Sequence, residues 1–115
     1  MKRIKEVIKK YSVIYVENGF SLRREVFSAG DEIEAVEKAF KIAYAHDKDA
    51  LEMYLVDLEG LRDGYDGAED YEDYLLAVND LLADPPCKTY NYLVTVVDLE
   101  EHKSLIVDCN EFFLQ

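Results

Sequence analysis

Residues 11–44 read YSVIYVENGFSLRREVFSAGDEIEAVEKAFKIAY and contain the clearest structural signals of this chain. Apolar side chains alternate from Tyr11 to Tyr15, which is typical of a β-strand with one buried face. Asn18-Gly19 then predicts a hairpin, because both central positions of a type I′ turn take positive φ. The expected cross-strand pairs are Glu17 with Phe20, Tyr15 with Leu22 and Tyr11 with Val26. This register places the apolar residues of both strands on one face of the hairpin.

An amphipathic helix is expected directly after the hairpin. Gly30 or Asp31 is its predicted N-cap, and Asp31 with Glu34 has the spacing of a capping box. The predicted buried stripe consists of Ile33, Val36, Phe40, Ala43 and Tyr44. The charged run from His46 to Asp49 is expected to end the helix.

The remaining elements follow from shorter patterns. Residues 2–10 have helical spacing of apolar residues, and residues 51–58 alternate like a strand. Residues 69–83 predict a second main helix that Pro85-Pro86 ends, and residues 90–98 and 104–112 predict a closing hairpin. The expected fold class is α+β, with a mostly antiparallel sheet of about five strands and two main helices on one face, in the order (α)ββαβαββ. The 115 residues are expected to form a single domain.

Composition excludes several classes of function. The chain has 25 acidic and 13 basic residues, a net charge of −12, which disfavours direct binding to nucleic acid or to an anionic membrane. No apolar run reaches the roughly 18 residues needed to span a bilayer, and the first ten residues lack the apolar core of a secretory signal. Two cysteines, Cys87 and Cys109, are too few for a disulfide scaffold. A cytoplasmic location is therefore expected.

The negative charge is concentrated in one part of the chain. Residues 1–10 carry a net +4, so the other 105 residues carry −16. Residues 57–73 alone contain eight acids and one base, Arg62. Tyr65, Tyr71 and Tyr74 are interleaved with these acids. Such a segment favours a partner that is itself basic.

On the expected helix 69–83, carboxylates line the face opposite the apolar residues. Glu69, Asp73, Asp80 and Asp84 follow one another at about 6, 10 and 6 Å along the axis, a scale comparable to the phosphate repeat of a nucleic acid. Most acidic faces are simply solvated, and the local charge is the reason to consider a binding face. The candidate partner-binding residues are Asp63, Tyr65, Asp66, Glu69, Asp70, Asp73, Leu76, Asp80 and Asp84.

Motifs for catalysis are absent from the sequence. His46 and His102 lie in charged segments, and no zinc-binding, phosphate-binding or nucleophile motif occurs. The acids do not match the spacing of an EF-hand, although a loose divalent-cation site in the acidic loop stays open. We therefore expect no enzyme activity, no cofactor and no dedicated metal site.

These features resemble, as a type and without an alignable sequence, the small acidic α+β proteins of phages and mobile elements that inhibit host restriction or CRISPR nucleases. The residues that carry the resemblance are Asp57 to Asp73 with their tyrosines and the stripe that ends at Asp84. The resemblance implies an inhibitor, located in the host cytoplasm, that binds a basic nucleic-acid-handling protein through a nucleic-acid-mimicking face and does not bind nucleic acid itself. The alternatives are an immunity protein or antitoxin against a nuclease toxin, and an acidic adaptor or subunit. A homodimer also stays open.

Overall fold

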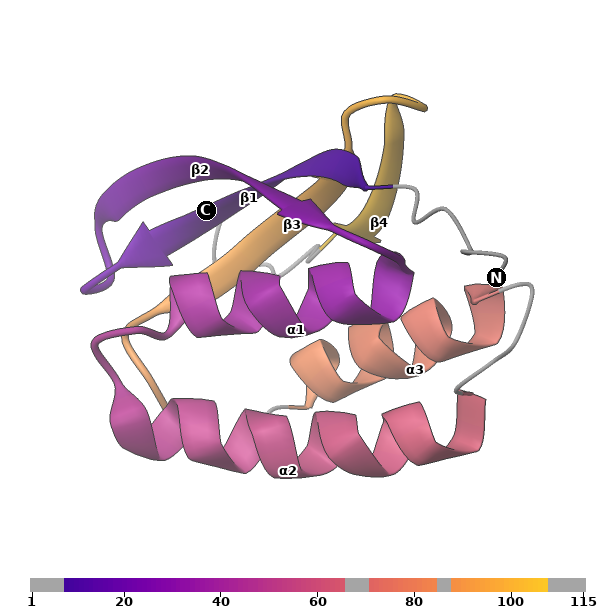
Figure 1. Ribbon diagram of the computed structural model, residues 1–115. Helices are drawn as coiled ribbons and strands as arrows, with labels where there is room; N and C mark the ends of the chain where they lie inside the picture. Colours follow the sequence, from indigo (N-terminus) through magenta and orange to yellow (C-terminus); the bar gives the residue numbers. More distant parts are fainter. Residues whose placement is uncertain (1–7, 66–70, 85–87, 108–115) are drawn as a thin grey trace, which may run out of the picture.

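The computed structural model describes residues 8–65, 71–84 and 88–107. In these ranges the chain forms an antiparallel sheet and helices in the order ββαααββ (Figure 1). The elements are β1 (Lys9–Glu17), β2 (Ser21–Ala29), α1 (Glu32–Ala43), α2 (Lys48–Tyr65), α3 (Glu72–Ala83), β3 (Tyr92–Asp98) and β4 (Lys103–Val107). The expected α+β class is confirmed, with four strands in place of about five and three helices in place of two in the described part of the chain.

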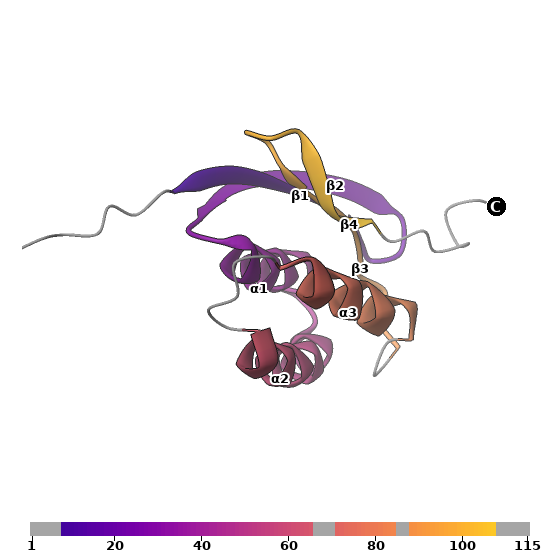
Figure 2. The same ribbon diagram turned by 90° about the vertical axis from the view of Figure 1, so that its right-hand side faces the viewer.

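The sheet has the strand order β2-β1-β3-β4, and each neighbouring pair is antiparallel. All three helices lie on the same side of the sheet (Figure 2). Helices α1 and α3 pack against the strands, while α2 packs against α1 and α3 and forms an outer layer. The distance of α2 from the sheet leaves much of its surface to solvent.

The predicted hairpin is present, but its register is shifted by one residue. Asn18 and Gly19 have positive φ, and the N–H of Phe20 donates to the carbonyl oxygen of Glu17 at 3.3 Å. Phe20 then forms a third loop residue, so Glu17 pairs with Ser21. The other expected pairs are also wrong: Tyr15 pairs with Arg23 and Tyr11 with Phe27.

This shift reverses the face on which the apolar residues of β2 lie. Side chains alternate across a strand, so a slip of one residue moves each of them to the other face. Phe27 stacks on Tyr11 on the core side, with ring centroids 5.8 Å apart. Leu22 and Val26 instead point away from the helices and are exposed.

Helix α1 follows the expected local chemistry. Asp31 Oδ1 accepts the backbone N–H of Glu34 at 2.8 Å, and Glu34 Oε1 accepts that of Gly30. Asp31 is therefore the N-cap, while the Glu34 side chain bonds one residue before the cap and not the N–H of Asp31 that a capping box would use. All five residues of the predicted stripe are buried.

Residues 51–58, predicted as a strand, are part of the helix α2. Asp47 caps this helix, because its Oδ1 accepts the N–H of Ala50 at 3.2 Å and its carbonyl oxygen accepts that of Leu51 at 2.9 Å. Ala50, Tyr54 and Leu58, spaced by four residues, are buried. The run from His46 to Asp49 thus ends α1 and also starts α2.

The other boundaries differ less. Lys9 and Lys10 belong to β1, so the helix expected over residues 2–10 is wrong at that end, and residues 1–7 lie outside the described ranges. The helix expected at 69–83 is observed as α3 from Glu72 to Ala83, and residues 69–70 lie outside the described ranges. The closing hairpin is observed as β3 and β4. The end of its predicted second strand, residues 108–112 with Cys109, lies outside the described residues, and so does Cys87.

Aromatic and polar contacts join the layers. The rings of Phe40, Tyr44 and Tyr54 pack together with centroid distances of 4.8–5.8 Å between α1 and α2. The buried Asn91 donates to the carbonyl oxygen of Ala43 at 2.8 Å and accepts the N–H of Asn18 at 3.1 Å. This side chain therefore ties the end of α1, the hairpin turn and the start of β3 together.

Candidate protein-binding site on helices α2 and α3

Helices α2 and α3, with the residues that flank α3, carry a strongly acidic surface. Residues 48–65 and 71–84 contain nine acids, all exposed, and two bases, Lys48 and Arg62. The acids are Asp49, Glu52, Asp57, Glu59, Asp63, Glu72, Asp73, Asp80 and Asp84. Arg62 is already engaged, because its Nη1 lies 3.0 Å from Oε2 of Glu37 on α1. We call the surface formed by these nine acids the acidic surface.

An open groove of about 530 Å³ runs between α2 and α3 within this surface. Its lining consists of Val56, Asp57, Gly60, Leu61, Ala77, Asp80, Leu81 and Asp84. Nothing lies within 4 Å of the position that a Cβ of Gly60 would occupy, so this side of the groove is open. The groove combines three carboxylates with apolar contacts, which suits the long apolar stem and charged end of a lysine or arginine side chain.

The predicted site residues fall at different places on these helices. Asp80 and Asp84 line the groove, and Asp73 and Leu76 are exposed on α3. Asp63 is exposed near the end of α2. Tyr65 is half-buried, and its ring lies edge-on to that of Tyr74, with centroids 6.2 Å apart. Asp66, Glu69 and Asp70 lie outside the described residues.

The contribution of α2 to the groove was missed at the sequence level. The strand predicted over residues 51–58 includes Val56 and Asp57, so the sequence predicts no contact of these residues with the second main helix. The spacing of Ala50, Tyr54 and Leu58 is the signal that could have identified this helix. Asp47, three residues before Ala50, has the position of a capping residue and supports the same interpretation.

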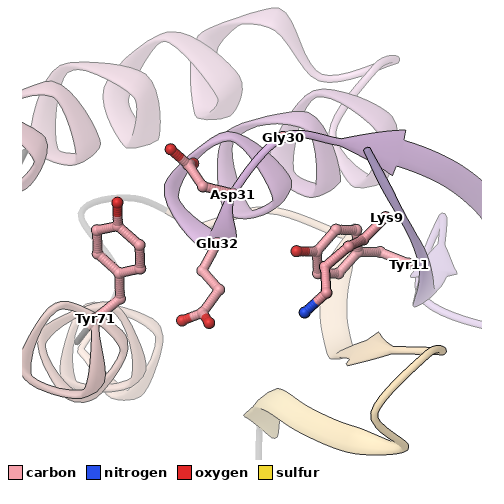
Figure 3. Close-up of a pocket in the computed structure, with 6 residues that line it drawn as sticks. All are labelled: Lys9, Tyr11, Gly30, Asp31, Glu32 and Tyr71. Atoms are coloured by element: carbon pink, nitrogen blue, oxygen red, sulfur yellow. The ribbon is translucent and has the colours of Figure 1, made fainter. Parts of the chain in front are cut away.

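A second cavity of about 240 Å³ lies at the N-terminal end of α1 (Figure 3). Its lining consists of Lys9, Tyr11, Gly30, Asp31, Glu32 and Tyr71. Figure 3 shows the Glu32 carboxylate between Tyr71 on one side and Lys9 with Tyr11 on the other. Burial raises the pKa of Glu32, and burial together with Asp98 raises the pKa of Tyr11 to about 12.

Lys9, the cation of this second cavity, is already paired. Its Nζ lies 3.0 Å from Oδ2 of Asp98 and also contacts Oε2 of Glu101. These hydrogen bonds raise the pKa of Lys9 above its ordinary value. The internal pairing points to a structural role for the cluster, and the groove between α2 and α3 is the better candidate for binding.

The rest of the described chain offers little other chemistry. No three His, Cys, Asp or Glu residues in the described ranges are grouped so that they could hold a metal ion. His46 is exposed, with its Nε2 3.7 Å from Oε2 of Glu17, and His102 is exposed in the turn before β4. None of the helices seen in these ranges combines the length and the apolar content needed to cross a bilayer.

No protein-family model matches this chain, and no curated protein or solved structure is significantly similar to it. Any statement about function therefore depends on the chemistry of the site. That site presents a dense set of carboxylates with apolar residues between them. Such a surface attracts cationic side chains and repels phosphate groups.

Proposed function

We propose that the protein is a non-enzymatic inhibitor that binds a basic, nucleic-acid-handling protein through its acidic surface. The observation that carries this proposal is the presence of nine exposed acids and two bases on α2 and α3, with acids of both helices lining one groove. Clustered like charges cost stability, so a surface of this kind is easiest to explain if a partner uses it.

The partner surface is one that evolved for a phosphate backbone. Each lysine or arginine in such a channel would meet a carboxylate oxygen in place of a phosphate oxygen, and both form charge-assisted hydrogen bonds with cations. Asp73 and Asp80 on α3 and Asp84 at its C-cap are separated by about 10 and 6 Å along the axis, from a rise of about 1.5 Å per residue. Occupation of the channel by these helices excludes the nucleic acid.

Apolar contacts would complement the charges. Leu76 on α3 is 58 % exposed and Val56 beside the groove is 67 % exposed. Burial of such side chains against a partner contributes affinity that salt does not screen. The carboxylates would then govern the association rate and the choice of partner, while the apolar contacts slow dissociation.

The first experiment identifies the target. Affinity capture from a host lysate at low and at high salt, followed by mass spectrometry, should recover a basic nuclease or another nucleic-acid-binding protein that is lost at high salt. A toxin nuclease encoded next to this chain would assign it as an immunity protein. A partner that does not handle nucleic acid would favour an acidic adaptor.

The second experiment tests the groove itself. Asp57→Lys with Asp80→Lys places two lysines in the groove lining and should weaken target binding and inhibition by about tenfold or more. Glu52→Lys with Glu59→Lys is the matched control, because it changes the net charge equally at exposed positions of α2 outside the groove lining. Equal losses of target binding in the two variants would exclude the groove as the binding site. A third variant, Asp73→Lys with Asp80→Lys, tests the acidic surface as a whole. Unchanged target binding and inhibition in this variant would exclude the acidic-surface mechanism.

A further inference from the structure

Strand β2 forms one edge of the sheet, with β1 as its only neighbour among the described strands. In an antiparallel sheet, the N–H and C=O groups of one residue both point to the strand on one side, and those of the next residue point to the other side. Glu17 directs its carbonyl oxygen to β2, as its bond from Phe20 shows, and Lys10 directs its own to the β3 side, where it accepts the N–H of Leu99 at 3.0 Å. The odd-numbered residues of β1 therefore face β2, and their partners Arg23 and Glu25 face back toward β1.

The even-numbered residues of β2 consequently direct their N–H and C=O groups to the free edge. One end of this edge is already covered, because Lys38 of α1 donates to the carbonyl oxygen of Ser28 at 2.7 Å. The hairpin turn limits the other end. The open segment runs from Leu22 to Val26, and its centre is Arg24.

This open segment lacks several of the features that protect edge strands. It contains no proline, and its pairing with β1 shows no bulge. Leu22 is 69 % and Val26 55 % exposed, on the face of the sheet that carries no helix in the described part of the chain. A further strand at this edge would satisfy the open backbone groups and cover both apolar side chains.

We propose that β2 pairs antiparallel with β2 of a second copy of this chain, about a two-fold axis at Arg24. In this register Leu22 lies opposite Val26 of the partner subunit, and Arg23 lies opposite Glu25 of the partner subunit. The symmetry produces each pair twice. The two four-stranded sheets join into one continuous sheet.

The charges of the segment are self-complementary in this register. Arg23 Nε already lies 3.2 Å from Oε1 of Glu17, and a guanidinium has further N–H groups for a second carboxylate. Arg24 meets its own copy at the axis, which costs affinity because like charges lie opposite each other. The net charge of −12 on each copy also opposes association. The dimer therefore depends on concentration and becomes tighter as salt screens this repulsion.

The geometry leaves the acidic surface of both copies accessible. Helix α2 lies on the far side of α1 and α3 from the sheet, away from the strands (Figure 2). A dimer through β2 would present two acidic surfaces to a target, and linked sites bind with higher avidity than either site alone. The dimer does not depend on the proposed inhibitory function, and its salt dependence has the opposite direction.

Sedimentation equilibrium over a range of protein and salt concentrations tests the proposal. Leu22→Lys with Val26→Lys should raise the dimer dissociation constant by about tenfold or more, because both symmetry-related apolar cross-strand pairs are lost. The matched control is Met53→Lys with Val56→Lys, which replaces two exposed apolar residues of α2 and adds the same charge. This control should leave the dimer dissociation constant unchanged. Circular dichroism verifies that both variants are folded.

A cysteine at the axis tests the register. With Cys87 and Cys109 replaced by serine, Arg24→Cys should form an intermolecular disulfide, since the Cα atoms of a hydrogen-bonded pair are about 5.5 Å apart. Arg23→Cys should not, because its copy lies two residues further along, beyond the roughly 7 Å limit for a disulfide. A wild-type chain that stays monomeric at every concentration, an edge variant that behaves like its control, or no cross-link at Arg24→Cys would each overturn the proposal.

Discussion

Replacement of Asp98 by alanine should remove one of the main polar attachments of the sheet. Asp98 ends β3 and is 2 % exposed. Its Oδ1 accepts the backbone N–H groups of Glu100 at 2.9 Å and Glu101 at 3.1 Å, and its Oδ2 accepts from Lys9 Nζ at 3.0 Å. The side chain thus holds the β3–β4 turn to the first residue of β1.

The expected cost of Asp98→Ala follows from these three bonds. The bond from Lys9, whose side chain is mostly buried, contributes about 2 kcal/mol, and each amide bond about 1 kcal/mol. The sum of about 4 kcal/mol is a large part of the roughly 5–15 kcal/mol that stabilises a domain. Asp98→Asn keeps an oxygen for the two amides and loses the charge, so it should cost about 2 kcal/mol.

Urea unfolding followed by far-UV circular dichroism measures both variants, and pH provides a second readout. Burial opposes ionisation of Asp98, but the hydrogen bonds from Lys9 and from the two backbone amides outweigh it and hold its pKa below the ordinary value. A carboxyl group with a lowered pKa stabilises the fold above its unfolded pKa of about 4, and this contribution disappears as the pH falls through the folded pKa. The difference between wild type and Asp98→Asn should therefore be constant from about pH 7 to pH 5 and shrink below about pH 4. A loss under 1 kcal/mol for Asp98→Ala, or a difference that persists in acid, would refute this reasoning.

Three further changes have expected effects on stability, each measured by urea unfolding. Tyr74→Phe should leave the free energy of unfolding unchanged or raise it by up to about 1 kcal/mol. The buried hydroxyl has no hydrogen-bond partner among the described residues, and burial raises its pKa. A clear loss of stability would reveal a hydrogen bond to this hydroxyl. Gly60→Ala should stabilise α2 by about 0.5–1 kcal/mol, because alanine favours a helix and its Cβ would meet nothing within 4 Å. Unchanged or lower stability would contradict the open space at this position. Asp57→Asn with Asp80→Asn should stabilise the fold by a few tenths of a kcal/mol while weakening target binding, because like charges are removed. This last gain should shrink at high salt, and a gain that does not change with salt would argue against charge repulsion.

Local signals predicted one part of the fold well. The bond from the N–H of Glu34 to the Asp31 cap and the positive φ at Asn18-Gly19 depend on residues only a few positions apart. Their chemistry is the same in a short peptide as in the folded chain, which is why the first helix and the turn could be predicted.

Two predictions failed because the local patterns were ambiguous. An Asn-Gly turn is compatible with a loop of two or three residues, and the register of the hairpin depends on whether Phe20 joins the strand. Residues 51–58 fit the alternation of a strand and also the spacing of a helix. Packing of Tyr54 against Phe40 and Tyr44 favours the helix, and these contacts join residues that are distant in the sequence.

The sequence by itself determined the charge, its concentration after residue 57 and the amphipathic character of α1 and α3, because composition and short-range periodicity do not depend on the fold. Only the tertiary structure decided that Asp57 lies in the same groove as Asp80 and Asp84, since that contact requires α2 to be a helix packed on α3. It also decided that Leu22 and Val26 point away from the helices. A register shift of one residue reverses the faces of a strand, and short-range pattern alone does not distinguish the two registers.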